Sequence, residues 1–278
     1  MTSVQKAIKY LAMAFAVFLS VSIIGGIFTG LAGVSFIFSD HEKDKAVGEI
    51  QSYPTDEEIS SLYLNLSAAD LRIKTADKFS VESNHKYISV STDNGKLVID
   101  ETKTAYSLFT NSVTVILYIP ENFVFDDVQI ETGAGEVRID SLSADVLSLS
   151  LGAGETTIGN LTANSRADIE GGVGELTING GTLRNVELDM GVGELTLKSR
   201  IEGKSSLNNG IGETKLTLLG SRDDYQIALD KGIGEASLEG ESMRDDSVYG
   251  SGRNLISIDG GIGEISIRFS ESEIKEAA

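Results

Sequence analysis

The four-residue motif Gly-x-Gly-Glu occurs seven times in the second half of this chain, at a nearly constant spacing. The copies begin at Gly133, Gly152, Gly172, Gly191, Gly210, Gly232 and Gly261, so the steps are 19, 20, 19, 19, 22 and 29 residues. A fixed period of about 20 residues is the sequence signature of a repeat architecture. The motif therefore limits the fold to a stack of similar units before composition is considered.

Apolar residues recur at three places in each repeat. A large aliphatic residue stands three residues before each first glycine, from Ile130 to Ile258, and another stands six residues after it, from Ile139 to Ile267. Local alternation between them has the period of two that is typical of strands. We expect these two positions to face the interior, together with the residue between the glycines, which grows along the chain: Ala134, Ala153, Val173, Val192, Ile211, Ile233 and Ile262.

The glycine pairs are predicted to form corners, because glycine tolerates a positive φ and lets a neighbouring backbone pass close by. One repeat buries too few aliphatic side chains to offset the entropy of ordering about 20 residues, so successive repeats must stack. The predicted fold is all-β, a single-stack parallel β-solenoid (β-helix) of about 20 residues per coil. The predicted corner residues are Gly133, Gly135, Gly152, Gly154, Gly172, Gly174, Gly191, Gly193, Gly210, Gly212, Gly232, Gly234, Gly261 and Gly263.

The repeat extends upstream of the first motif. Leu66–Ile73 matches Thr132–Ile139 position by position, and Leu64 then corresponds to Ile130. The turn residues Asp93-Asn94-Gly95 between two apolar alternating runs indicate a hairpin. We therefore predict a degenerate, strand-rich opening of the solenoid followed by its regular part, with the bounds 59–125 and 126–270.

The N-terminal part of the chain has a different composition. After a short tail, residues 1–9, the stretch 10–39 carries no charge and is rich in aliphatic residues and phenylalanine. About 20 apolar residues can span a bilayer, and the apolar region of a cleaved signal peptide is usually shorter. Residues 10–39 are therefore predicted to be a transmembrane helix that acts as a signal anchor, with the lipid bilayer as its partner. An acidic tether, residues 40–58, follows it, and residues 271–278 form a C-terminal tail.

The net charge argues against some partners of this chain, and the spacing of small residues suggests another. The chain has no cysteine and a formal net charge of −19, which excludes thiolate chemistry and makes nucleic acid a poor partner. Ser22, Gly26 and Gly30 follow one another at intervals of four residues, a spacing that allows helix-mediated self-association. We expect a single-pass protein of the cell membrane with an extracellular solenoid.

The repeated glutamates are candidate metal ligands. They occupy one position of the repeat, and Asp70 extends their column: Glu136, Glu155, Glu175, Glu194, Glu213, Glu235 and Glu264. A second, mostly acidic column stands two residues before each first glycine. Stacked carboxylates repel one another, and side chains splayed into water, raised pKa values, hydrogen bonds from the corner amides or bound cations can relieve the repulsion. The hypothesis is weak binding of Ca²⁺ or Mg²⁺, which take carboxylate oxygens, and no other cofactor is expected.

The same residues argue against catalysis. None of the glycine pairs continues into Gly-x-Gly-x-x-Gly, which excludes a dinucleotide-binding turn. Neither His41 nor His85 has a Ser, Cys or Asp partner at a recognisable spacing. The carboxylates repeat equivalently, whereas glycosidase sites single out one pair. We predict that the protein is not an enzyme.

The repeat breaks between the sixth and seventh motifs. The step of 29 residues inserts roughly nine residues within the range 240–254. Insertions in solenoids form loops on one face, which is often the binding face. The predicted partner-binding residues are Met243, Arg244, Asp245, Asp246, Tyr249 and Arg253.

The chain from about Leu62 to Phe269 resembles a bacterial family of "putative adhesins", a domain of unknown function with a β-solenoid fold. The resemblance is carried by the segments LNLSAADLRI, VTVILYIP, ETGAGEVRI, LGAGETTI and GGVGELTI. It implies a domain that often follows a single membrane helix, and some members accompany Lia-type envelope-stress systems. The family provides no catalytic residues to transfer to this sequence.

The predicted function is that of a membrane-anchored, non-enzymatic surface binding module of the cell envelope, either an adhesin or an envelope-stress-associated protein. Its partner is expected to be a protein or a cell-wall component. The alternative is a structural or regulatory scaffold for neighbouring membrane proteins, with weak divalent-cation binding along the glutamate column.

Overall fold

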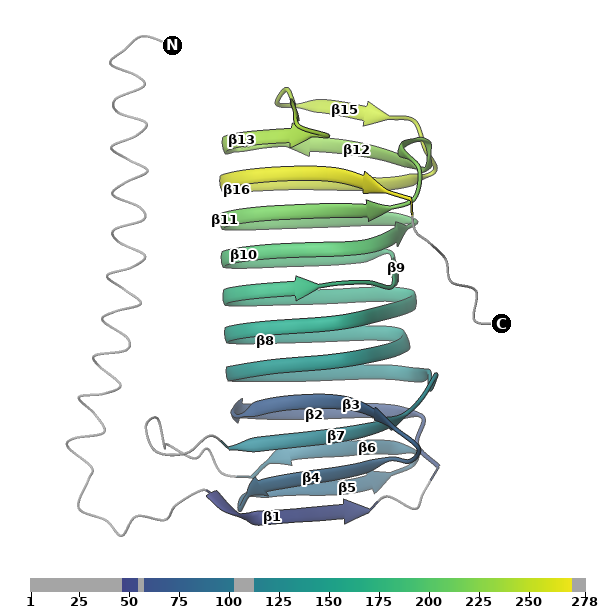
Figure 1. The fold of residues 1–278 in the computed structure, drawn as a ribbon, viewed down its shortest axis with the longest axis vertical. Helices are drawn as coiled ribbons and strands as arrows, with labels where there is room; N and C mark the ends of the chain where they lie inside the picture. The colour runs from purple at the N-terminus through teal and green to yellow at the C-terminus, as the bar shows by residue number, and fades with distance from the viewer. Residues whose placement is uncertain (1–46, 55–57, 103–112, 272–278) are drawn as a thin grey trace, which may run out of the picture. The chain divides into compact units, whose positions relative to one another are not determined.

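The computed structural model describes residues 47–54, 58–102 and 113–271, which lie in the compact unit Ala46–Ala278 and fold almost entirely into strands (Figure 1). The elements in chain order are β1 Val47–Pro54, β2 Ser61–Ala68, β3 Asp70–Ala76, β4 Ser80–His85, β5 Ile88–Asp93, β6 Lys96–Glu101, β7 Thr114–Pro120, β8 Phe125–Ile178, β9 Thr182–Arg184, β10 Val186–Glu202, β11 Lys204–Leu219, the short 3-10 helix η1 Arg222–Asp224, β12 Tyr225–Asp230, β13 Ile233–Leu238, β14 Glu241–Ser242, β15 Ser247–Gly250 and β16 Asn254–Ser270.

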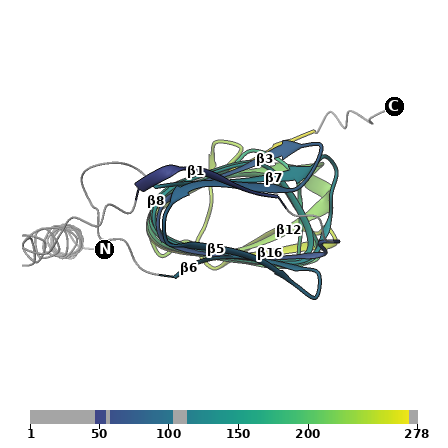
Figure 2. The ribbon, with the colours of Figure 1, turned by 90° about the horizontal axis from the view of Figure 1, so that it is seen from below.

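The central part of the body is a parallel β-solenoid, as predicted. The coils stack as two facing walls that meet at a narrow edge (Figure 2). Each motif aligns with its equivalent in the next coil, so that Glu194 in β10 lies beside Glu175 on one side and Glu213 on the other. Upstream, Leu64 pairs with Ile130 and Ile73 with Ile139. The predicted match between the degenerate and the regular repeats is therefore confirmed.

The interior is filled by two of the three predicted apolar columns. The residues three before the first glycine, such as Ile130 and Leu188, are buried, and so are those six after it, such as Ile158 and Leu197. The residue between the glycines is different, because Val173 keeps 40% of its surface exposed. The chain turns through the corner at the two glycines, which places the residue between them on the outer side. The expectation that this third column faces inward is therefore wrong.

Both ends of the stack contain antiparallel pairs, of which the sequence predicted only the hairpin at Asp93-Asn94-Gly95. At the N-terminal end, β5 pairs with β6, β4 with β7 and β1 with β4, all antiparallel. The β5–β6 hairpin turns at Asn94 and Gly95, which both have positive φ, as the turn signal indicated. At the C-terminal end, β15 pairs with β12 and β14 with β13, again antiparallel. Short reversed strands at both ends cover coil edges that would otherwise be open to pairing with other chains.

The coils do not stack in the order of the sequence. The seventh repeat, in β16, lies between the fifth and the sixth: Gly263 pairs with Gly212 of β11 on one side and with Gly234 of β13 on the other. Figure 1 shows β16 (yellow) between β11 and β13 (both green). The long step before the seventh motif is thus the path by which the chain passes over the end of the stack and returns. Repeat spacing alone predicts sequential stacking, and this expectation is corrected.

The fold class is corrected in its helical part. Among the ranges that the structure describes, no helix is long and apolar enough to cross a membrane. The predicted transmembrane segment, residues 10–39, lies outside these ranges. The stretch predicted as an acidic tether, residues 40–58, contains β1, whose partner is β4. A strand with no strong alternation of apolar residues could not be recognised there from the sequence.

Candidate functional site

The stacked Gly-x-Gly-Glu turns form one long edge of the body, here called the corner edge. In six of the seven turns the second glycine has a positive φ, as at Gly193 with +143° and Gly212 with +146°, whereas in the sixth turn the first glycine, Gly232, has it. A Cβ on Gly193 would overlap the carbonyl oxygen of Gly174, and a Cβ on Gly212 that of Gly193. Both the backbone conformation and the close approach of the neighbouring coil therefore require glycine. The result is a backbone edge that is rigid and nearly invariant from coil to coil.

An aliphatic ridge follows the crest of the corner edge. It is formed by the residues between the glycines, which in stacking order are Ala134, Ala153, Val173, Val192, Ile211, Ile262 and Ile233. Val173 and Ile233 are 40% and 38% exposed, and the three residues between them are half-buried against one another. Because the ridge changes from alanine to valine to isoleucine, the edge is shallow at its N-terminal end and prominent at its C-terminal end.

Carboxylates flank the ridge on both sides. On one side stand the predicted cation-binding residues, and register pairs Glu175 with Glu194, Glu194 with Glu213 and Glu213 with Glu264. On the other side stand the acidic and amide residues that precede the corners: Glu131, Ser150, Glu170, Asp189, Asn208, Asp259 and Asp230. The corner edge therefore combines an apolar crest with two acidic flanks.

Two basic side chains relieve part of the repulsion within the glutamate column. Lys215 places its Nζ 2.8 Å from Oε1 of Glu194 and 3.0 Å from Oε2 of Glu213, and Arg138 contacts Glu136. The hydrogen bond from Lys215 lowers the pKa of Glu194 below its ordinary value of 4.5. The hydrogen bond to Glu194, followed by that to Glu213, raises the pKa of Lys215 above 10.5. Lys215 therefore relieves the repulsion between Glu194 and Glu213, as the cation-binding hypothesis expected of a bound Ca²⁺ or Mg²⁺.

Replacing Lys215 with methionine should remove this relief and change the pH dependence of stability. A carboxylate whose pKa is lowered by folding contributes stability above its unfolded pKa, and loses it as the pH falls through the folded value. We expect Lys215→Met to raise the pKa of Glu194, measured by ¹³C NMR titration. The melting temperature should fall at neutral pH and approach that of the wild type below about pH 4. Lys198→Met, at an exposed position of the same wall, serves as the control. An unchanged Glu194 pKa would contradict the assignment.

The structure describes no ready-made metal centre. Within the described ranges, no group of three or more histidine, aspartate or glutamate side chains is close enough together to hold a metal ion. The predicted ligands form an open column along one side of the ridge, with one carboxylate in each coil. Weak binding of Ca²⁺ or Mg²⁺ along this column stays a prediction.

A shallow groove runs beside the ridge at its N-terminal end. Its walls include the carboxylates Glu131, Glu170 and Asp189, and Leu151 and Met190 contribute apolar surface to it. The groove spans the coils in which the ridge residue is alanine or valine. The groove is thus lined by the residues that precede the corners, on the flank of the ridge that carries Glu131, Glu170 and Asp189.

The predicted partner-binding loop forms the C-terminal cap of the stack. Met243 is 2% exposed and lies in the core, and the hydroxyl of Tyr249 accepts a hydrogen bond from the backbone N–H of Arg244 at 2.6 Å. Asp245 accepts one from the backbone N–H of Lys231 at 2.9 Å. Asp246 and Arg253 are exposed. Four of the six predicted residues thus hold the cap together, and the function of the set in partner binding stays a prediction.

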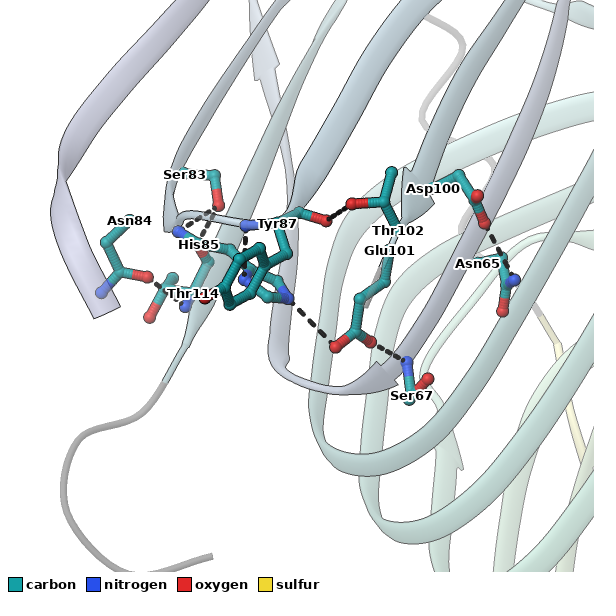
Figure 3. A network of polar contacts seen from close by, with 10 residues as sticks. All are labelled: Asn65, Ser67, Ser83, Asn84, His85, Tyr87, Asp100, Glu101, Thr102 and Thr114. Atoms are coloured by element: carbon teal, nitrogen blue, oxygen red, sulfur yellow. Dashed lines mark hydrogen bonds and ion pairs between the residues drawn. The ribbon is translucent and has the colours of Figure 1, made fainter. Parts of the chain in front are cut away.

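A buried polar network ties the N-terminal cap to the first corner (Figure 3). The Nε2 atom of His85 lies 3.1 Å from Oε1 of Glu101, and both side chains are almost fully buried. The other oxygen of Glu101 accepts a hydrogen bond from the backbone N–H of Ser67 at 2.7 Å. Ser67 stands where later repeats have their first glycine. The sequence singled out His85 but gave no sign of Glu101, because the two residues meet only through the antiparallel cap.

Comparisons with known proteins agree with this architecture. The family described as Toastrack DUF4097 matches residues 59–253. No curated protein matches the sequence.

The solved structures to which this chain is similar share little sequence with it. A putative adhesin from Bacteroides fragilis NCTC 9343 is similar with a TM-score of 0.50 and 14% identity, over 80% of this chain and 96% of that chain. A putative cell adhesion protein from Clostridium sporogenes ATCC 15579 has a TM-score of 0.33 and 16% identity, over 80% and 99%. A putative lipid binding protein from Parabacteroides distasonis ATCC 8503 has a TM-score of 0.38 and 14% identity, over 81% and 98%. At 14% identity, the similarity to the protein from Bacteroides fragilis shows a shared fold alone.

Proposed function

We propose that this chain, which belongs to the Toastrack DUF4097 family, is a non-enzymatic binding module whose corner edge contacts a macromolecular partner. The observation that carries the proposal is the aliphatic ridge, which is a continuous line of partly exposed apolar side chains between two acidic flanks. Contiguous exposed apolar surface with a polar rim is typical of interaction sites. Among the residues that the structure describes, the other large exposed apolar side chains, those of Ile50, Val124, Val146 and Val248, lie outside the Gly-x-Gly-Glu turns.

The distribution of ionisable groups supports a binding function rather than catalysis. The carboxylates of the corner edge repeat from coil to coil, and where one is singled out, the hydrogen bond from Lys215 lowers the pKa of Glu194, which makes it a weaker base. The buried pair of His85 and Glu101 is closed to solvent and holds the cap to the first corner. A rigid backbone with a repeated surface is suited to contacting an extended partner.

The proposal places this surface at the cell envelope, in accordance with the adhesin resemblance. The test uses the absence of cysteine from the chain, since any introduced thiol is then unique. A cysteine at Ile211 should react with a membrane-impermeant maleimide more slowly in intact cells than in the purified protein. Equal rates in the two settings would contradict partner binding through the ridge. No labelling in cells of a cysteine at the exposed Val146 would contradict the location.

A further inference from the structure

The spacing of the ridge favours one kind of partner backbone. From Val173 to Ile233 the ridge residues occupy adjacent coils, which are about 4.8 Å apart in a parallel stack. A partner strand laid along the ridge would present its inward side chains about 6.7 Å apart, so the two periods would soon be out of phase. A helix repeats one face about every 5.4 Å, which keeps it nearly in phase over the whole ridge of about 19 Å.

The flanks of the ridge define the charge of that partner. Beside Val173, Val192, Ile262 and Ile233, carboxylates stand on both sides of the crest, and beside Ile211 Glu213 stands opposite Asn208. Lys215 lies on the same flank and forms ion pairs with Glu194 and Glu213. An apolar stripe between two rows of basic side chains would match both the crest and its flanks.

The same charges argue against a second copy of this chain as the occupant. Two ridges packed face to face would bring four acidic columns together, in a chain whose net charge is −19. Like-charge contacts of this kind oppose association. Self-association through the ridge is therefore an outcome that the experiment must detect rather than the expected one.

We propose that the ridge from Val173 to Ile233 docks an amphipathic helix of a partner protein, with an aliphatic stripe on the ridge and lysine or arginine side chains over both acidic flanks. This inference rests on the proposed function and adds the class of the partner. Helices that lay an apolar face on a complementary surface use one anchor per turn, which is the spacing that the ridge offers.

The test is a titration of the full-length protein with two synthetic helical peptides of about 18 residues, a length of roughly 27 Å. The first peptide has a leucine stripe between two lysine faces. The second has the same composition, with its leucines dispersed around the helix. Fluorescence anisotropy should give saturable, one-to-one binding of the striped peptide. The dispersed peptide should bind about tenfold more weakly or not at all, because it can match the charge but not the crest.

Matched variants identify the surface. Val173→Thr, Val192→Thr, Ile211→Thr and Ile262→Thr, combined in one protein, keep β-branched residues at one exposed and three half-buried positions, so the fold should persist, as checked by circular dichroism. They should weaken binding of the striped peptide about tenfold, whereas Val146→Thr with Val248→Thr should leave it unchanged. Glu175→Gln, Glu235→Gln and Glu264→Gln should weaken binding and reduce its dependence on salt.

Each outcome has a defined meaning. Equal affinity of the two peptides, or wild-type affinity of the threonine variant, would overturn the inference. A concentration-dependent dimer that the threonine variant abolishes would overturn it in favour of self-association. If the thiol at Ile211 is protected in cells but the striped peptide does not bind, the partner is not a basic helix and the proposed function still stands. If the thiol is fully reactive, the proposed function itself fails.

Discussion

Replacing Gly193 with alanine is expected to destabilise the protein by about 4 kcal/mol or more, which is exceptional for the addition of one methyl group. The new Cβ would overlap the carbonyl oxygen of Gly174, and the φ of +143° is in a region that is essentially limited to glycine. Neither coil can move without breaking the register of its neighbours. Urea denaturation followed by circular dichroism gives the change in the free energy of unfolding.

Gly240→Ala is the matched control for this substitution. Gly240 also has a positive φ, +81°, but no atom lies within 4 Å of the position that its Cβ would take. The substitution should therefore cost only the backbone strain of a left-handed residue, about 1–2 kcal/mol. If Gly193→Ala costs no more than Gly240→Ala, the close stacking of the corners is wrong.

Ending the chain after Gly252 is expected to unfold the C-terminal end of the stack rather than trim it. This truncation removes β16, which pairs with β11 on one side and with β12 and β13 on the other. It deletes the buried side chains of Ile256, Ile258, Ile265 and Ile267, worth roughly 1.5–3 kcal/mol each. Their sum is comparable with the entire free energy of unfolding of a typical domain. Hydrogen exchange should show β12, β13 and β15 unprotected.

A chain that ends after Glu271 is the control for the truncation, because it retains all of β16 and should keep the wild-type exchange pattern. Sequential stacking makes the opposite prediction for the shorter chain. If the seventh repeat were the terminal coil, its removal would leave the sixth repeat paired with the fifth. Protected amides in β12 and β13 of the shorter chain would therefore contradict the order in which the coils stack.

The repeating part of the fold was predictable because each position sees the same neighbours in every coil. The spacing of the motif and the alternation around Ile130 and Ile139 were sufficient to predict parallel coils, and register confirms them. Even the degenerate repeat at Leu64 was recognisable. The resemblance to the adhesin family is confirmed by the match over residues 59–253.

The ends of the stack were not predictable from the same signals. A period shows that the seventh repeat is equivalent to the others, but not which coil it pairs with, since Gly263 fits equally well against Gly212 or Gly234. The contact between His85 and Glu101 depends on an antiparallel cap that has no periodicity. Met243 looked like part of an exposed loop, because nothing in the sequence indicates that the chain folds back over the open core.

The candidate site was recognisable only in part. The acidic columns were evident from the aligned motifs, and so was the increase in size from Ala134 to Ile262. The direction in which these aliphatic residues point was mistaken, because strand alternation does not continue into the corner itself, where the chain turns between the two glycines. The residues between the glycines therefore point outward, and the column that was assigned to the core forms the crest of the corner edge.

The measurement that tests the central claim most directly is the rate of thiol labelling along the crest in intact cells. Single cysteines at Val173, Ile211 and Ile262 are compared with one at Val146, each relative to the same purified variant. The account predicts that the three crest positions are protected severalfold in cells, whereas Val146 reacts at its free rate. Equal reactivity of crest and control would contradict the claim that the corner edge is a binding surface.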